Sequence, residues 1–243
     1  MKGALRSAFF IALKDMKAYY FKPPNISWGM LFPLVFILAF YLRSPIAFAH
    51  LIPGLLSLSL LFSTTSMEAI VITFERMTGA LERLMLYPVS VTTILAGKIS
   101  GGACFGITVT IVFLLGLIIL FPLHLEKPLL FLMSVVISSF TFSALGAFVS
   151  VSVKQVFEAQ TLANLFRFPM IFLSGVFIPV SSLPSIIKPI AYIMPLTYSI
   201  DSIKVSFGYA PQIMHPLLSL IILVVFAFVF LGLSVNILKG RMS

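Results

Sequence analysis

Apolar runs of about 20 residues recur along this chain and leave few architectures open to it. Six such runs occupy residues 26–42, 50–73, 94–121, 129–152, 161–180 and 214–238. A transmembrane helix needs a run of about this length, whereas a transmembrane strand shows about ten alternating residues. Because 60% of the 243 residues are hydrophobic and 9% are charged, while soluble domains have about a quarter charged, a soluble enzyme is excluded. We therefore predict an all-α membrane protein with six transmembrane helices.

The segment before the first run, residues 1–22, has a different pattern. Leu5, Phe9 and Met16 recur at helical spacing, while most of the basic side chains lie elsewhere on the helical wheel. Charges interrupt the apolar residues throughout, which is not the pattern of a cleaved signal peptide. The segment is predicted to be an amphipathic interfacial helix that ends before Pro23 and Pro24.

The basic residues indicate how the chain is oriented in the membrane. With the N-terminus in the cytoplasm, 12 of the 16 Lys and Arg residues fall on or near the inner side, and four fall outside: Arg43, Lys127, Lys188 and Lys204. Because positive residues resist translocation, we expect a multi-pass protein of the plasma membrane with both termini cytoplasmic. The net charge of +9 is spread between apolar runs, so the lipid bilayer, and no nucleic acid, is the expected partner.

One apolar stretch does not fit simple spanning. Between residues 168 and 200 the only charge is Lys188, and four prolines divide the segment: Pro179, Pro184, Pro189 and Pro195. Prolines at this spacing break helices. We predict that residues 161–180 span the membrane and that residues 182–207 form an outer re-entrant helical hairpin before the last span. Irregular backbone at that depth must be shielded by protein or line a cavity.

The predicted cytoplasmic loop of residues 74–90 has two periodic faces. On one helix, an apolar face would contain Phe74, Met77, Leu81, Leu84 and Met85. Glu75 with Glu82, and Arg76 with Arg83, repeat at i, i+7 on another face, and Pro88 ends the helix. This pattern fits either a solvated interfacial helix or a lever that docks in a partner and carries its motion to the spans.

Two blocks of residues resemble the ABC transporter permease family of the second export type, which includes daunorubicin-resistance and polysaccharide exporter subunits. The first block is Glu75-Arg76-x-x-Gly79-x-Leu81-Glu82-x-Leu84, then Tyr87-Pro88-Val89-Ser90 and Gly97-Lys98. The second is Leu173-Ser174-Gly175-Val176-Phe177-Ile178-Pro179, Leu183-Pro184 and Pro195-Leu196-Thr197-Tyr198-x-x-Asp201. Leu13-Lys14-Asp15 and Lys22-Pro23 also fit. Ala80 departs from the family pattern, in which Thr often follows the glycine.

The resemblance implies that residues 1–243 are a single transmembrane permease domain. Two such chains, as a homodimer or heterodimer, would form the pathway of an exporter, with ATP hydrolysed by separate cytoplasmic ABC ATPase subunits. Residues 75–86 would be the coupling helix, with the ATPase-coupling residues Glu75, Arg76, Gly79, Leu81, Glu82, Arg83 and Leu84. The N-terminal amphipathic segment would be a connecting helix. The outer region would include Gly175, Pro179, Pro184, Pro195 and Tyr198. An amphiphilic substrate is implied: a drug, as in multidrug resistance, a lipid or a glycan.

No motif for chemistry is present in the sequence. The phosphate-binding loop requires Gly-Lys followed by Ser or Thr, and no Lys in this chain precedes Ser or Thr. Neither a Gly-x-Ser-x-Gly elbow nor a His-Glu-x-x-His motif occurs. We therefore expect a transport subunit rather than an enzyme, with no catalytic residue, metal or bound cofactor. The alternative is a secondary transporter or channel that is not coupled to ATP, which would need more intramembrane carboxylates than the one predicted, Glu68.

Two charges, Glu68 and Arg167, lie inside predicted spans rather than at their ends. A charge in a span normally faces the bundle interior and a partner. One hypothesis is that Glu68 and Arg167 pair across the second and fifth spans as an inner gate. The alternative is that both side chains extend to the cytoplasmic interface.

Overall fold

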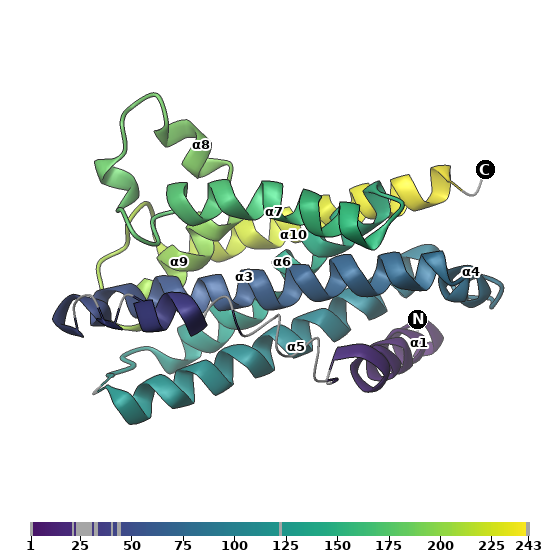
Figure 1. The fold of residues 1–243 in the computed structure, drawn as a ribbon, viewed down its shortest axis with the longest axis horizontal. Coiled ribbons are helices and arrows are strands. Elements are labelled where there is room, and N and C mark those ends of the chain that lie inside the picture. Colours follow the sequence, from purple (N-terminus) through teal and green to yellow (C-terminus); the bar gives the residue numbers. More distant parts are fainter. Residues whose placement is uncertain are drawn as a thin grey trace.

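A computed structural model describes residues 2–20, 22, 31, 34–39, 41–42, 45–121 and 123–241, and this part of the chain is helical, without a strand. Four helices there are long and apolar enough to cross a membrane: α3 (Pro45–Met77), α5 (Val91–Leu120), α6 (Pro128–Ser152) and α10 (Pro216–Gly240). They run along the long axis of the molecule (Figure 1), with α1 (Lys2–Asp15) at one end. A π-helical turn, η1 (Met16–Tyr20), continues α1. The predicted helical class of the fold is therefore confirmed.

The other two predicted spans are not among these four. The fifth, residues 161–180, corresponds to α7 (Val156–Leu173), which begins and ends earlier than predicted and is about 27 Å long at 1.5 Å per residue. The chain turns away after Leu173 because Gly175 adopts a left-handed conformation, with φ of 90°. Of the first predicted span, residues 26–42, only residues 31, 34–39 and 41–42 are described, and these are helical. The count of six spans stays a prediction.

Helix α3 lies in the middle of the bundle, where it packs against α5, α6 and α7. It carries many hydroxyl side chains that are buried, and most of them donate to carbonyls of the preceding turn. Ser63 Oγ lies 2.6 Å from the Ser59 carbonyl oxygen, for example. Others bond between helices, as Thr73 does to Ser150 on α6 at 2.8 Å. Because these polar atoms are satisfied inside the protein, α3 remains stable in the bundle core.

Glycines on α5 let three neighbouring helices, α1, α3 and α6, approach its backbone closely. A Cβ on Gly102 would lie 2.6 Å from Ser143 Oγ and would also meet the Glu68 carboxylate of α3. A Cβ on Gly97 would lie 2.8 Å from the Ala8 carbonyl oxygen of α1. Small residues at such spacings are typical of close helix packing in lipid. Here they join helices within one chain.

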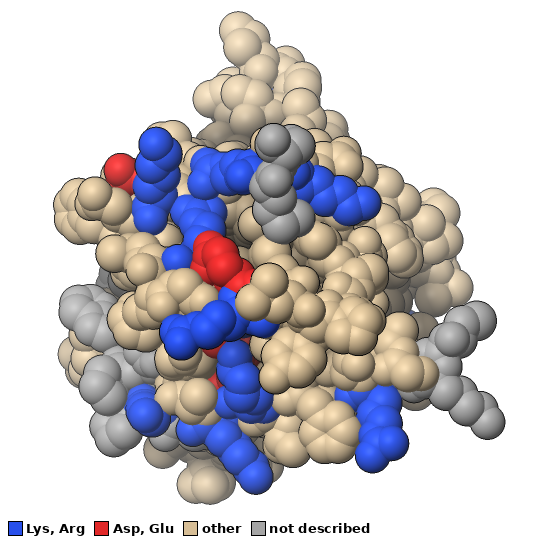
Figure 2. Space-filling view, turned by 90° about the vertical axis from the view of Figure 1, so that its right-hand side faces the viewer, with Lys and Arg blue, Asp and Glu red and all other residues tan. Residues whose placement is uncertain are grey.

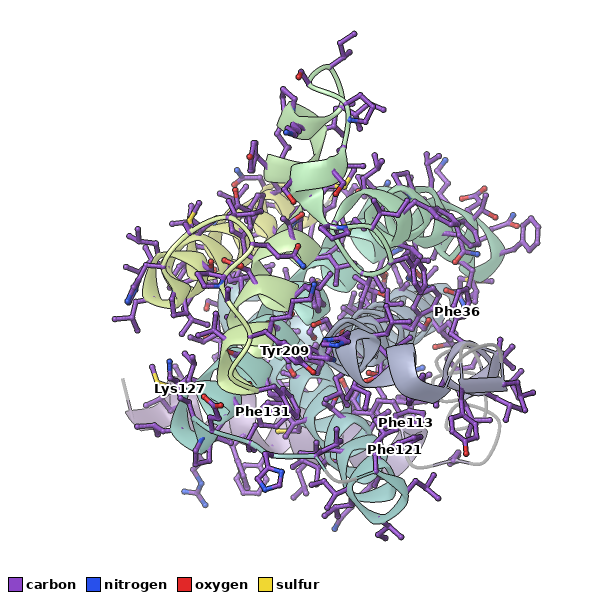
Figure 3. The ribbon with its side chains drawn as sticks, turned by 90° about the vertical axis from the view of Figure 1, so that its left-hand side faces the viewer. Phe36, Phe113, Phe121, Lys127, Phe131 and Tyr209 are labelled. Atoms are coloured by element: carbon purple, nitrogen blue, oxygen red, sulfur yellow. The ribbon has the colours of Figure 1, made fainter. Side chains whose placement is uncertain are left out.

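The opposite end of the bundle holds three short elements: η2 (Val180–Ser182), α8 (Lys188–Tyr192) and α9 (Pro195–Ser206). Two short helices thus occupy the predicted re-entrant segment, and their depth in a membrane stays a prediction. Figure 3 views this end, where aromatic rings gather around the starts of α3 and α6 and the end of α5. The Phe48 and Phe121 ring centroids are 5.0 Å apart, and those of Phe131 and Phe207 are 5.8 Å apart. Such contacts hold the loops of this end together.

Candidate coupling site

The predicted coupling helix is two helices rather than one. Helix α3 ends at Met77, the chain turns at Gly79, and a short helix, α4 (Ala80–Met85), follows. Gly79 has φ of 71°, a conformation that favours glycine. Arg83 closes this turn, because its guanidinium donates to the carbonyls of Thr78 and Gly79, both at 3.2 Å. The prediction of one continuous helix over residues 75–86 is therefore wrong. The apolar and charged faces predicted for that single helix do not exist as such, because the chain turns at Gly79.

Helix α4 has one buried side and one exposed side. Leu81 is fully buried among Ile72, Ile94 and neighbouring apolar residues, and Leu84 packs at the edge of this cluster. Glu82, Leu86 and Tyr87 are exposed, the last two by 85% and 69%. We call these three residues the α4 tip. An exposed Leu and Tyr beside a carboxylate form a small amphipathic surface at the end of the bundle, where Figure 1 shows α4.

Helices α1, α3 and α5 meet at an ion cluster of four residues, of which all but Lys14 are buried: Lys14, Asp15, Glu75 and Lys98. Lys98 Nζ is 2.9 Å from Asp15 Oδ2 and also pairs with Glu75. Lys14 pairs with Glu75 and lies 3.0 Å from Asp15 Oδ1. Two positive and two negative charges compensate one another, as burial requires. Because the four residues come from α1, α3 and α5, the cluster fixes these helices to one another near the end of α3, which α4 follows.

Lys14 is the member of the cluster at its solvent edge. Burial alone lowers the pKa of Lys14, but its hydrogen bond to Glu75 and its attraction to Asp15 and Glu75 outweigh that effect, so the pKa is raised above its usual value of 10.5. Lys14 therefore remains charged at neutral pH and keeps the cluster electrically balanced.

The structure buries Glu75 and half-buries Arg76, whereas the sequence predicts both on a charged outer face. Glu75 is buried in the ion cluster. Arg76 donates to the Val151 carbonyl at 3.4 Å and to that of Val153, while Arg241 donates to the Ser152 carbonyl at 2.9 Å. Two cations thus satisfy the terminal carbonyls of α6, where the helix dipole favours positive charge. Of the paired charges, Glu82 and Arg83 alone are exposed.

Sequence reasoning missed three members of the cluster as site residues: Lys14, Asp15 and Lys98. A signal was present, since Lys98 lies within the apolar run of residues 94–121 and a lysine there needs a counter-charge. Its acidic partners are 83 and 23 residues away in the chain. Helical periodicity cannot link positions that far apart.

Glu68 and Arg167 do not form the hypothesised ion pair in this structure. Glu68 Oε1 accepts a hydrogen bond from the Tyr20 hydroxyl at 2.7 Å. Arg167 donates to the side-chain oxygens of Asn164 and Gln160 and lies over the Phe62 ring, 5.0 Å from its centroid. Both charged residues are buried, so neither extends to the surface. The Glu68 and Arg167 side chains therefore contact different polar or aromatic groups, on different sides of α3.

The outer region contains the predicted residues in structural roles. Pro179 precedes η2, the Pro184 carbonyl accepts from the Ile187 amide at 2.9 Å, and Pro195 begins α9. The Tyr198 hydroxyl donates to the Tyr192 carbonyl at 2.6 Å.

Asp201, which the sequence analysis did not place among the site residues, is the anchor of this region. Its buried carboxylate accepts hydrogen bonds from the backbone N–H of Gln212 at 2.5 Å and from Ser219 Oγ at 2.9 Å. Weaker bonds come from the amides of Ile213 and Met214. The Gln212 side chain then reaches the Gly175 carbonyl at 3.4 Å. Asp201 thereby ties α9 to the loop before α10 and to the turn after α7.

Charge is distributed unevenly over the molecule. Figure 2 shows the end that carries α1, α4 and the end of α10, where Lys and Arg side chains gather around a few acidic ones. The N-terminal end of α1 and the C-terminal end of α10 lie on this side. Among the described residues, no three His, Cys, Asp or Glu side chains come close enough together to hold a metal ion.

Comparison with known proteins identifies the family. The sequence pattern of a family described as "ABC-2 type transporter" matches residues 7–207. The chain belongs to this family. Its permease subunits are membrane components of transport that perform no catalysis, as the sequence predicted.

Two curated relatives extend the comparison of this ABC-2 type permease. The "Probable multidrug ABC transporter permease YbhS" of Escherichia coli K12 is 24% identical over 218 residues, which are 87% of this chain and 57% of the relative. The "Inner membrane transport permease YadH" of the same strain is 23% identical over 157 residues, 65% of this chain and 61% of the relative. The chain spans less than two thirds of the length of either one.

Proposed function

We propose that this chain is the membrane-spanning permease subunit of an ATP-driven exporter and that the α4 tip is its contact with a separate cytoplasmic ATPase. Membership in the ABC-2 type family supports the first part. The second part rests on the α4 tip itself, an exposed amphipathic surface just after α3, whose last turns carry Glu75 of the ion cluster. A push on α4 would pass to α1, α3 and α5 together, because the cluster joins them.

The same proposal covers the membrane arrangement. Six spans are reached when residues 26–42 and α7 cross the membrane with the four long helices, and α8 and α9 then form the outer re-entrant hairpin. The basic end would face the cytoplasm with both termini, because positive residues remain on the inner side. Two permease copies, identical or related, would enclose a path for an amphiphilic substrate across the inner membrane. The words "multidrug" and "inner membrane" in the names of the relatives agree with this arrangement.

The test is an affinity purification of the tagged full chain from gently solubilised host membranes. We expect wild-type protein to bring down an ABC ATPase, identified by mass spectrometry, and to show vanadate-sensitive ATP hydrolysis. The double variant Leu86→Ser/Tyr87→Ser should lose most of the bound ATPase. Without the ATPase, the variant permease should have the elution volume and melting temperature of the wild-type permease, because both side chains are exposed.

Ile186→Ser is the matched control, since Ile186 is 88% exposed near α8 at the opposite end of the bundle. It should retain the ATPase. Equal retention by the double α4 variant would contradict the assignment of the α4 tip. Leu81 is unsuitable for this test, because its side chain is fully buried and its substitution would disturb packing.

A further inference from the structure

Arg167 on α7 is a buried cation that none of the Asp and Glu side chains neutralises. Its side chain is 2% exposed. All seven Asp and Glu residues lie in the described part of the chain, and none is within 4.0 Å of its guanidinium nitrogens. Nη1 donates to Asn164 Oδ1 at 3.2 Å and Nη2 to Gln160 Oε1 at 3.4 Å. Nε is buried without a hydrogen-bond partner.

The acidic residues are committed elsewhere, so a small side-chain movement would not supply the missing charge. Asp15 and Glu75 belong to the buried ion cluster, and Glu68 accepts a hydrogen bond from Tyr20. Glu158 caps the start of α7, and Asp201 anchors the outer region. Glu82 and Glu126 are exposed. A buried charge in a membrane protein normally has a partner of opposite charge. The charge of Arg167 is therefore available to an anion from outside the chain.

An apolar groove on α7 shares the residue Asn164 with the surroundings of this cation. It has a volume of about 550 Å³ and runs along α7, lined mainly by Val153, Phe157, Thr161, Leu162, Leu165 and Phe168. Asn164 belongs to the wall of the groove and also bonds Arg167. The half-buried amide of Asn164 therefore links the guanidinium to the groove, and the half-buried amide of Gln160 is the other hydrogen-bond partner of the guanidinium. Glu158, the one charged residue of the lining, is nine residues from Arg167, about 13 Å along the helix.

We infer that Arg167 and the groove on α7 form a binding site for an anionic amphiphile, with the acyl or aryl part in the groove and a phosphate or carboxylate group on the guanidinium. Rotation of the Asn164 and Gln160 side chains frees Nη1 and Nη2, and Nε is already unpaired. A planar guanidinium binds such oxyanions in a bidentate manner. The rotated amides then present their own N–H groups to the anion. This inference rests on the proposed export of amphiphiles and narrows their class to anionic ones.

The site favours anions for two physical reasons. A cationic amphiphile would bring a second positive charge beside a desolvated guanidinium, where repulsion is poorly screened. A neutral amphiphile would displace the two amide contacts without replacing them by charged ones. The Phe62 ring, 5.0 Å from the guanidinium, holds its other face and keeps it in place.

The experiment measures equilibrium binding of radiolabelled dodecyl phosphate to the purified full chain in dodecyl maltoside micelles. Dodecyltrimethylammonium, which has the same alkyl chain, is the cationic comparison. We expect one saturable site per chain that binds the phosphate at least tenfold more tightly than the cation. Arg167→Gln should weaken the binding of dodecyl phosphate at least tenfold. Lys154→Gln, an exposed lysine before α7, should bind as wild type does.

Asn164→Asp provides a second variant in case Arg167→Gln does not fold. It places a carboxylate of the same size where the amide now bonds Arg167 at 3.2 Å. It should abolish binding of dodecyl phosphate while it raises the melting temperature. Wild-type affinity in Arg167→Gln or in Asn164→Asp, or equal affinity for the cation, would overturn the inference. No ATPase is needed for this assay, so its failure leaves the proposed coupling intact, and failure of the coupling test leaves this site intact.

Discussion

Removal of Lys98 from the buried ion cluster should destabilise the whole end of the bundle that carries α1 and α4. Its ammonium lies 2.9 Å from Asp15 Oδ2 and also pairs with Glu75. One contact at that distance is worth about 6 kcal/mol in Coulomb energy at an effective dielectric constant of 20. Much of this is offset by the cost of removing both charges from water. Lys98→Met leaves two buried carboxylates with Lys14 alone, and breaking a buried pair in this way costs about 3–5 kcal/mol.

The assay is heating of the detergent-solubilised protein, followed by size-exclusion chromatography of what remains folded. At roughly 2–4 °C per kcal/mol for a chain of this size, Lys98→Met should lower the melting temperature by roughly 6–20 °C. Lys17→Met is the matched control, because Lys17 is exposed on η1 and forms no ion pair among the described residues. Its melting temperature should stay close to that of wild type.

A double variant separates the loss of charge balance from the loss of packing. Lys98→Met with Glu75→Gln removes one charge of each sign and restores electrical neutrality in the cluster. It should melt above the value obtained by adding the two single effects, with an interaction energy of about 0.5–3 kcal/mol. A melting temperature of Lys98→Met within 2 °C of wild type, or strict additivity in the double variant, would refute the role assigned to the cluster.

Three further outcomes follow from particular contacts. Gly102→Ala should cost about 1–3 kcal/mol in thermal unfolding, because its Cβ would lie 2.6 Å from Ser143 Oγ, whereas Gly116→Ala, with open space around it, should be nearly neutral; equal effects would contradict the close approach of α5. Asp201→Asn should cost about 1.5–3 kcal/mol and speed proteolysis of the loop before α10, since the carboxylate accepts from that loop; unchanged proteolysis would contradict its anchoring role. The amides of Lys154 and Gln155 lower the pKa of Glu158 below its usual 4.5, so the helix cap is present above pH 4.5 and is lost as pH falls through that lowered pKa. Glu158→Ala should therefore lower the melting temperature at pH 7 but not at pH 2, and a difference that persists at pH 2 would count against the cap.

The hydrophobic pattern predicted the large elements of the fold because a spanning helix is a local property of the sequence. Four helices, α3, α5, α6 and α10, correspond to the apolar runs at residues 50–73, 94–121, 129–152 and 214–238. Most of the helix ends lie within a few residues of the predicted ends. The main shift is the start of α3, which reaches back to Pro45. The helix ends differ from the predicted ones where a cap or a turn ends the helix, as the turn at Gly175 does after Leu173.

The details of the coupling site were less predictable. The periodicity over residues 74–86 gave no signal for the break at Gly79, because a single left-handed residue rotates everything after it. The i, i+7 spacing predicts that Glu75 and Glu82 share one helix face, yet Glu75 is buried and Glu82 is exposed. The partners of Glu75 come from α1 and α5, and only the tertiary structure brings them together.

Photocrosslinking from the α4 tip tests the proposed contact with an ATPase in intact cells. A benzophenone amino acid replaces Tyr87, which is 69% exposed, or Ile186 near α8 at the opposite end as the comparison. If α4 docks on the ATPase, illumination should crosslink an ABC ATPase to position 87 and none to position 186. An ATPase crosslinked equally from both positions, or from neither while it copurifies with the chain, would contradict coupling through α4.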